Sequence, residues 1–123
     1  MNTIKIEKIQ IDSKEIISVF SEDIVISDVQ SALDFLISVA YEKECNNFII
    51  NKEAIVESFF DLSTCMAGDI LQKCSNYQIK VAIYGDYKKY TSKALKDFIY
   101  ESNKGNIVFF VSDIQEGIDL LMK

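Results

Sequence analysis

The chain has 123 residues, of which 49% are hydrophobic, so it can form one domain with its own core, and a second domain would be too small to be stable. Its net charge of -6 is spread along the sequence, which argues against nucleic acid or an anionic membrane surface as a partner and favours a cationic protein surface. The chain has no His, and all 13 basic residues are Lys, which excludes His-based nucleophile activation, His-ligated metal sites and arginine fingers within it.

Cysteine usage and hydropathy favour a cytoplasmic protein. The three cysteines, Cys45, Cys65 and Cys74, form no CxxC pair, so we expect free thiols and neither a disulfide framework nor a zinc site. Cys65 is expected to be buried and inert, the alternative being a redox-active thiol at a helix N-terminus. No stretch approaches the ~18 to 20 apolar residues of a membrane span, and the N-terminus lacks a signal-peptide pattern. We expect no metal and no cofactor.

The N-terminal part of the chain predicts a hairpin followed by a helix. Apolar and polar residues alternate over residues 3–11 and again over 15–20, and the intervening residues 12–14 are turn formers. Ser27 then precedes a helical pattern of apolar residues, and Gln30 would complete a capping box with it.

The rest of the chain alternates between helices and strands. The apolar runs 47–50, 78–84 and 107–111 predict strands, and a helix is expected to begin near Thr64 after the first of them. Thr91 or Ser92 would cap the next helix, which Gly105 would end, and Asp113 and Glu116 would form the capping pair of the last helix.

Strands and helices that alternate in this way imply right-handed crossovers over a mainly parallel sheet. We therefore predict a single α/β domain, residues 1–123, with five strands and four helices in the order ββαβαβαβα. This order is similar to that of STAS domains, the group typified by bacterial anti-sigma factor antagonists. In that group a regulated Ser follows the third strand in a D-S-S-G context, whereas this chain has Asp61-Leu62-Ser63-Thr64 there. A shared topology does not by itself imply a shared function.

The loops 61–64 and 85–93 should leave the same carboxyl edge of the sheet, which is where α/β proteins place ligands. Ser63 and Thr64 would lie at a helix N-terminus, where free N–H groups and the helix dipole stabilise an added phosphate. They are therefore candidate phospho-acceptors. The simpler interpretation is that Thr64 is an N-cap worth about 1 kcal/mol and that Asp61 is a solvated turn carboxylate.

The second loop combines a carboxylate with lysines and hydroxyl groups. Asp86 and Lys93, with the neighbouring lysines 88 and 89, could form an anion or phosphoryl site, although no glycine-rich phosphate motif accompanies them. The simpler interpretation is a solvated turn. Tyr87 and Tyr90 could offer aromatic surface to a partner, or one of them could pack against the sheet.

Aromatic pairs occur at two further places. Phe59 and Phe60 precede the loop 61–64, and Phe109 and Phe110 lie in the last predicted strand. We expect these four residues in the core, the alternative being an exposed patch for dimerisation.

The stretch from Phe59 to Gly105 carries the pattern FFDL-x-T-x-x-AG, ILQK-x-SNY, K-x-AI-x-GD and Y-x-SK-x-L-x-DFI-x-ESN-x-G. It closely resembles a family of small bacterial domains without an assigned function. Asp69 departs from the family pattern, which has Glu there, so the negative charge is kept and the side chain is shorter. The resemblance implies that polar motif positions are site candidates, although the same residues could fix helix caps and ion pairs: Thr64, Asp86, Lys93, Asp97 and Glu101.

The leading hypothesis is a non-enzymatic regulatory or protein-interaction domain of the STAS-like type, controlled by phosphorylation at Thr64 or Ser63. Its carboxyl-edge loops would contact a protein partner, and a homodimer is a further option. The alternative is a small-molecule or anion sensor, or a small enzyme, in which Asp86 and Lys93 act as the acid-base pair. An enclosed pocket lined by Asp86, Lys93 and Asp61 would favour the alternative, and a flat or convex edge would favour partner binding.

Overall fold

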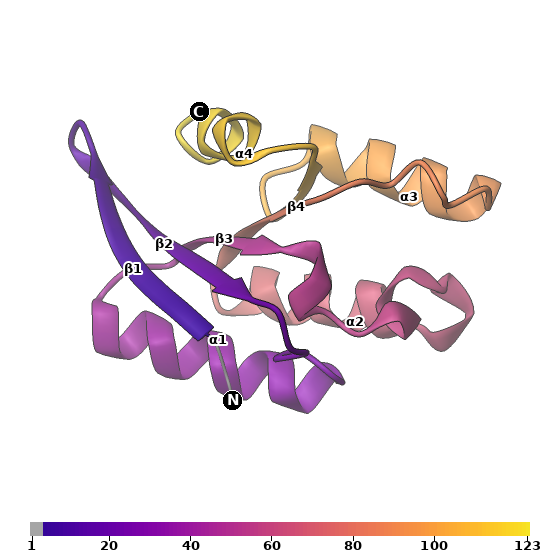
Figure 1. The fold of residues 1–123 in the computed structure, drawn as a ribbon, viewed down its shortest axis with the longest axis horizontal. Helices are drawn as coiled ribbons and strands as arrows, with labels where there is room; N and C mark the ends of the chain where they lie inside the picture. Colours follow the sequence, from indigo (N-terminus) through magenta and orange to yellow (C-terminus); the bar gives the residue numbers. More distant parts are fainter. Residues whose placement is uncertain (1–3) are drawn as a thin grey trace.

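A five-stranded sheet forms the centre of the computed structural model, which describes residues 4–123 (Figure 1). Its strands lie side by side in chain order, with β1 and β2 antiparallel and the others parallel. This confirms the α/β class and the mainly parallel sheet; the predicted start of the first strand at Thr3 lies outside the described residues. The strands are β1 (Ile4–Ile11), β2 (Lys14–Ser21), β3 (Asn47–Asn51), β4 (Lys80–Tyr84) and β5 (Val108–Val111).

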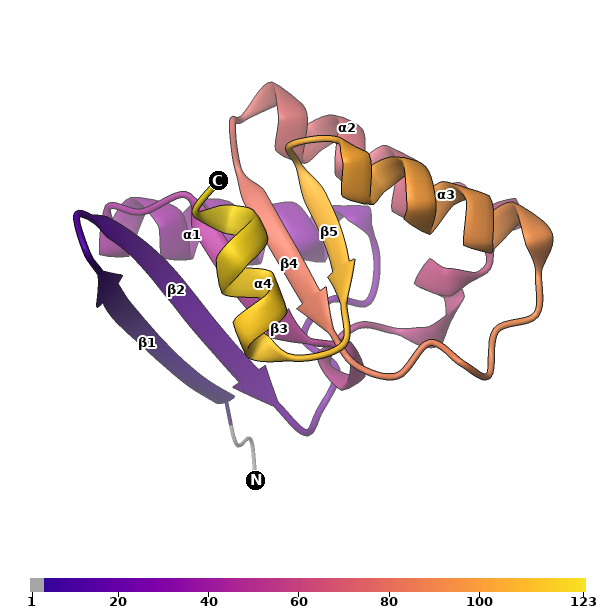
Figure 2. The same cartoon turned by 90° about the horizontal axis from the view of Figure 1, so that it is seen from above.

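Helices cover both faces of the sheet. α1 and α2 pack on one face and α4 on the other, while α3 lies alongside β5 at one edge (Figure 2). None of the helices described over residues 4–123 is long and apolar enough to cross a bilayer. The helices are α1 (Val29–Lys43), α2 (Met66–Asn76), α3 (Lys93–Lys104) and α4 (Ile114–Leu121), and three short 3-10 helices, η1 (Lys52–Ala54), η2 (Glu57–Phe60) and η3 (Leu62–Thr64), connect β3 to α2.

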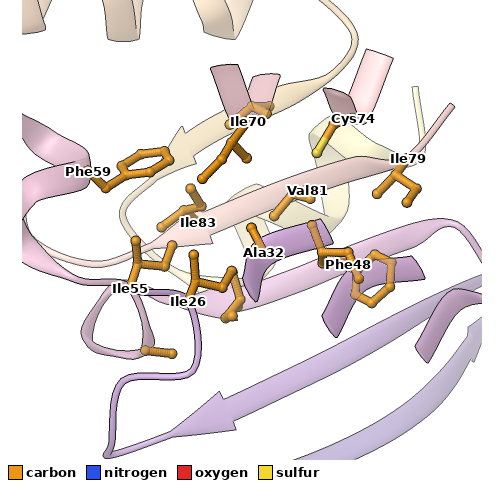
Figure 3. Close-up of a cluster of buried hydrophobic side chains, with 14 of the residues drawn as sticks. Ile26, Ala32, Phe48, Ile55, Phe59, Ile70, Cys74, Ile79, Val81 and Ile83 are labelled. Atoms are coloured by element: carbon orange, nitrogen blue, oxygen red, sulfur yellow. The ribbon is translucent and has the colours of Figure 1, made fainter. Parts of the chain in front are cut away.

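The sheet separates two apolar cores. The larger core lies under α1, α2 and α3, and Figure 3 shows Phe59 and Ile70 packed above the β4 residues Val81 and Ile83. The smaller core lies under α4, where Gly117 allows close approach: a Cβ at that position would lie 3.1 Å from the Cβ of Ala82. Strands β3 to β5 are therefore covered on both faces, which explains their continuous apolar runs. The burial of the Phe pairs at 59–60 and 109–110 is confirmed.

Of the four predicted N-caps, those of α3 and α4 are confirmed and those of α1 and α2 are wrong. Ser92 caps α3 and Asp113 caps α4, each by accepting a hydrogen bond from a first-turn N–H group. α1 is capped by Asp28 and Ser31, in place of the predicted Ser27 and Gln30. A carboxylate one residue further along is an equally good N-cap, and its Oδ1 accepts from the Ser31 N–H at 2.7 Å.

Candidate functional site

The connection between β3 and α2 contacts the loop after β4 at the carboxyl edge of the sheet. The ring of Phe60, which ends η2, stacks on Tyr90 with 5.2 Å between centroids and lies 5.9 Å from Tyr87. The Tyr90 hydroxyl donates to Glu57 Oε2 at 2.6 Å, and Lys89 Nζ donates to Glu57 Oε1 at 3.3 Å. On the side of the first loop the contacts come from Glu57 and Phe60, which precede the expected stretch 61–64. On the side of the second loop they come from Tyr87, Lys89 and Tyr90, which lie within the expected stretch 85–93.

Lys52 lies at the centre of this contact. It follows β3 directly, and its side chain is 10% exposed. Its ammonium lies 5.2 Å from the Phe60 ring centroid, 5.1 Å from that of Tyr90 and 3.9 Å from Glu57 Oε1. The rings and the carboxylate together compensate the lost hydration of the ammonium group. We call Lys52, Glu57, Phe60 and Tyr90 the edge cluster.

Gly85 makes room for the edge cluster. A Cβ at Gly85 would lie 2.7 Å from the Cβ of Lys52, so a larger residue would displace the stem of the lysine. The glycine of the Gly85-Asp86 motif therefore has a packing role across two strands. Sequence reasoning missed Lys52 and Glu57; a lysine placed directly after a buried apolar strand was the signal that could have indicated the first of them.

Ionisation states follow from this environment. Partial burial alone would raise the pKa of Glu57, but the hydrogen bonds from Tyr90 and Lys89 and the charges of Lys52 and Lys89 outweigh it, so the pKa is lowered. Burial and the bond to Glu57 raise the pKa of Tyr90, and burial raises that of Tyr87, whose hydroxyl donates to Ile83 O at 2.6 Å. Both phenols therefore stay protonated at neutral pH and serve as hydrogen-bond donors.

The residues 61–64 form an exposed, internally hydrogen-bonded turn. Asp61 Oδ1 accepts from the Ser63 hydroxyl at 2.7 Å and from the Ser63 N–H at 3.0 Å, and these bonds lower the pKa of Asp61. The Thr64 hydroxyl lies 2.9 Å from Ser58 O and 2.8 Å from Asp61 O, to which it can donate. Thr64 thus connects η2, η3 and the start of α2.

The start of α2 differs from the prediction. Helix α2 begins at Met66 with Cys65 as its N-cap, so Thr64 is not the cap, although its hydroxyl accepts from the Met66 N–H at 3.3 Å. Cys65 has a left-handed backbone (φ 64°) and is exposed, which corrects the expectation that it is buried. The reason is η3, an extra turn that moves the start of the helix further along the chain. Cys65 therefore lies in the connection before α2 and not on the buried face of the helix.

The other two cysteines are buried, and all three thiols are free. Burial raises the pKa of Cys74 to about 11, which keeps this thiol protonated and unreactive. In the part of the chain that the structure describes, no three Cys, Asp or Glu side chains gather as metal ligands would.

Asp86 and Lys93 are not brought together. Asp86 Oδ1 accepts from the Lys88 N–H at 2.9 Å, and this hydrogen bond closes a turn. The turn lines an open hollow of about 560 Å³, together with Gly85, Tyr87 and Ser112. Lys93 opens α3 and lies outside the residues that line this hollow. Its Nζ lies 2.8 Å from Asp97 Oδ2, and this hydrogen bond raises the pKa of Lys93.

The remaining candidates lie on the exposed surface of α3. Asp97 is the partner of Lys93, one turn away, and Glu101 lies 3.9 Å from Lys104 Nζ. Exposed pairs of this kind stabilise a helix by a few tenths of a kcal/mol and imply no ligand. The structure therefore divides the predicted site residues among the edge cluster, the turn 61–64, the hollow at Asp86 and the surface of α3.

The family model described as Domain of unknown function (DUF4180) matches residues 11–121. The chain belongs to this family. The match confirms the predicted resemblance to a family without an assigned function, and it includes both carboxyl-edge loops and the edge cluster of this DUF4180 domain. No curated protein and no solved structure matches the chain.

Proposed function

We propose that this DUF4180 domain is a non-enzymatic regulatory domain in the bacterial cytoplasm and that it binds another protein through its carboxyl edge. In this proposal it is a domain of the STAS-like type, and phosphorylation of Thr64 or Ser63 controls the binding. The observation that carries the proposal is the turn 61–64, whose exposed hydroxyl groups are part of the hydrogen bonds that hold the turn together.

The structure around this turn supports an interaction surface. The edge cluster ties η2 to the loop after β4, so the base of the turn is anchored to the sheet by stacked rings and by charge-assisted hydrogen bonds. Asp61, Ser63, Thr64 and Cys65 are exposed above it. A partner would meet a surface that needs little ordering before it binds, which lowers the entropic cost of association.

A phosphate at Thr64 would act on the conformation of the turn as well as on its charge. The Thr64 hydroxyl can donate to Ser58 O or Asp61 O, and a phosphorylated oxygen has no proton to donate. The added negative charge would also lie beside the N-terminus of α2, which favours it. Phosphorylation would therefore exchange contacts to η2 for contacts to the helix N-terminus and would change the shape of the surface.

The alternative, a sensor or enzyme based on Asp86 and Lys93, receives less support. General acid-base chemistry needs both groups within reach of one substrate atom. Lys93 is paired with Asp97 on the exposed side of α3, and the hollow beside Asp86 is open to solvent.

The test compares Thr64→Asp with Thr64→Asn in partner capture from a cell lysate. The two variants have side chains of the same shape and differ in charge, so their comparison isolates the effect of a negative group on binding. We expect Thr64→Asp to change the amount of retained partner and Thr64→Asn to retain as much as the wild-type chain. Equal capture by all three proteins, from a lysate in which the wild-type chain retains a partner, would contradict control at this position.

A stability measurement on the same variants separates binding from folding. Thr64→Ala should lower the free energy of unfolding by about 1 kcal/mol, because the hydroxyl bonds to Ser58 and Asp61 are lost. Thr64→Asp should also be less stable than the wild-type chain, since its carboxylate would face the same carbonyl oxygens. This differs from the expectation for a simple N-cap, at which Asp and Thr are nearly equivalent.

A further inference from the structure

Strand β1 forms one edge of the sheet and is open along its whole length. All 8 of its residues pair with β2, and no strand described over residues 4–123 lies on its other side. Figure 2 shows β1 at the outer border of the sheet, away from α3 and α4. The outward N–H and C=O groups of such a strand are available to another strand.

The opposite edge is closed. The Asn103 side chain, on α3, accepts from the Phe110 N–H at 2.7 Å and donates to Phe110 O at 3.0 Å. Strand β5 therefore has its outward backbone groups at Phe110 bonded within the chain, and α3 lies beside it. Of the two edges, only the one at β1 can accept a further strand without a rearrangement of the fold.

The charged side chains of β1 restrict which strand can pair with it. Lysines on an edge strand normally discourage pairing. Lys8, however, is held on its own chain, with its Nζ 2.8 Å from Lys43 O and 3.3 Å from Glu15 Oε2. Lys5 and Glu7 are both exposed, and neither has an ion-pair partner within the described part of the chain.

Lys5 and Glu7 lie on the same side of the sheet. Ile6, between them, packs against the larger core, so its two neighbours project from the opposite face, where α4 lies mainly over β3 to β5. Their charges are two residues apart and of opposite sign. A strand that runs antiparallel to β1 can therefore pair with both charges if it places an acidic residue opposite Lys5 and a basic residue opposite Glu7.

A second copy of β1 satisfies this condition in one register. Two identical antiparallel strands related by a two-fold axis place one residue opposite its own copy. Within residues 5 to 9, a centre at Lys5, Glu7 or Lys8 would place like charges opposite each other, and a centre at Ile9 would form no ion pair. A centre at Ile6 places Lys5 of each copy opposite Glu7 of the other, so both charges are paired across the axis.

We propose that β1 pairs with β1 of a second copy of this chain, antiparallel and centred on Ile6, so that the two sheets become one. The register forms reciprocal Lys5 to Glu7 ion pairs on one face and an Ile6 to Ile6 contact on the other. Ile4 of each copy lies opposite Lys8 of the other. Residues 61–64 and Asp86 take no part, so this proposal is independent of the proposed function.

Charge reversal tests the partner. Molar mass by light scattering should show a monomer–dimer equilibrium of the full chain over a concentration series that reaches about 1 mM. Lys5→Glu and Glu7→Lys should each weaken the dimer roughly tenfold, because each places like charges opposite each other at both positions. The double variant Lys5→Glu/Glu7→Lys should restore it, and an equimolar mixture of the single variants should form a heterodimer. Lys96→Glu, an exposed residue of α3, is the control for net charge and should leave the dimer unchanged.

Cross-linking tests the register. Opposed residues of antiparallel strands have Cα atoms about 4.5 to 5.5 Å apart, which suits a disulfide. In a Cys65→Asn background, which removes the exposed thiol and keeps a residue that tolerates left-handed backbone, Ile6→Cys should form a covalent dimer under mild oxidation. Ile9→Cys should not.

Three results would overturn the proposal. The first is a wild-type chain that stays monomeric throughout, which would leave the edge to a strand of a different protein. The second is a dimer that is indifferent to both charge reversals, which would place the interface elsewhere. The third is cross-linking through Ile9→Cys in preference to Ile6→Cys. Circular dichroism of each variant confirms that loss of the dimer is not loss of the fold.

Discussion

The two halves of the sheet are stabilised in different ways. Strands β3 to β5, which we call the parallel half, are buried on both faces, and their outer edge is bonded to Asn103. Strands β1 and β2, the hairpin half, are joined by a long ladder, but β1 is mostly exposed and its outer edge is open. The comparison shows that the outer edge of the parallel half is closed within the chain, whereas the outer strand of the hairpin half offers backbone groups for association.

The largest expected effect is the removal of a core side chain from the parallel half. Phe110 is 4% exposed and contacts the rings of Phe59, Phe60 and Tyr87. Phe110→Ala should lower the free energy of unfolding by about 3 to 5 kcal/mol. Phe20→Ala, in the hairpin half, should cost less than about 1 kcal/mol, because Phe20 is 39% exposed. Denaturant unfolding measures both losses, and equal losses would contradict the difference in burial between Phe110 and Phe20.

The packing of α4 on the parallel half allows a second comparison, between two glycine positions. Gly117→Ala adds a Cβ that would lie 3.1 Å from Ala82 Cβ, on a buried central strand that cannot yield, so we expect a loss of about 1 to 3 kcal/mol. Gly68→Ala, in α2, meets no atom within 4 Å and should stabilise the chain by up to about 1 kcal/mol. Thermal unfolding should show shifts of opposite sign, and a stabilised Gly117→Ala would mean that α4 packs loosely.

The closed edge of the parallel half can be opened by one substitution. Asn103→Ala leaves the N–H and C=O groups of Phe110 without their partners, at a cost of about 1 to 3 kcal/mol. Asn103→Asp retains the acceptor for the N–H group but places a carboxylate oxygen against the Phe110 carbonyl, so it should not restore stability. Asn106→Ala, at an exposed position nearby, is the control and should change stability by less than about 0.5 kcal/mol. A neutral Asn103→Ala would show that the edge is closed by packing alone.

The smallest expected effect is the pH dependence that Glu57 contributes at the carboxyl edge. Its folded-state pKa lies below the ordinary value of 4.5, so its contribution to stability is present above that value and is lost as the pH falls through the folded-state pKa. Tyr90→Phe removes one stabilising hydrogen bond to the carboxylate and should raise the pKa of Glu57, which NMR titration of the side chain measures. If the pKa of Glu57 is unchanged in Tyr90→Phe, its lowered value is due to the lysines and not to Tyr90. Glu57→Gln should reduce the pH dependence of stability in the acid range by the part that Glu57 contributes, and Glu7→Gln, in the hairpin half, should leave that part in place.

Local physics explains which features could be predicted from the sequence. Alternation in β1 and β2 and the buried runs of β3 to β5 are properties of a few consecutive residues, and Ser92 and Asp113 cap helices by bonds that span three residues. The same kind of reasoning misplaced the start of α2, because η3 inserts a turn that apolar spacing does not indicate. It also misplaced the cap of α1, where Ser27 and Asp28 are both suitable N-cap residues.

The sequence by itself determined the class of fold, the order of its elements, the proximity of the carboxyl-edge loops and the family to which the chain belongs. Only the tertiary structure decided which side chains meet there. Glu57 and Tyr90 are 33 residues apart, and Lys52 lies between their loops because parallel strands bring their carboxyl ends to one edge. The closed edge at Asn103 and the open edge at β1 likewise depend on strand order and on the position of α3, since no local pattern specifies which backbone groups remain unpaired.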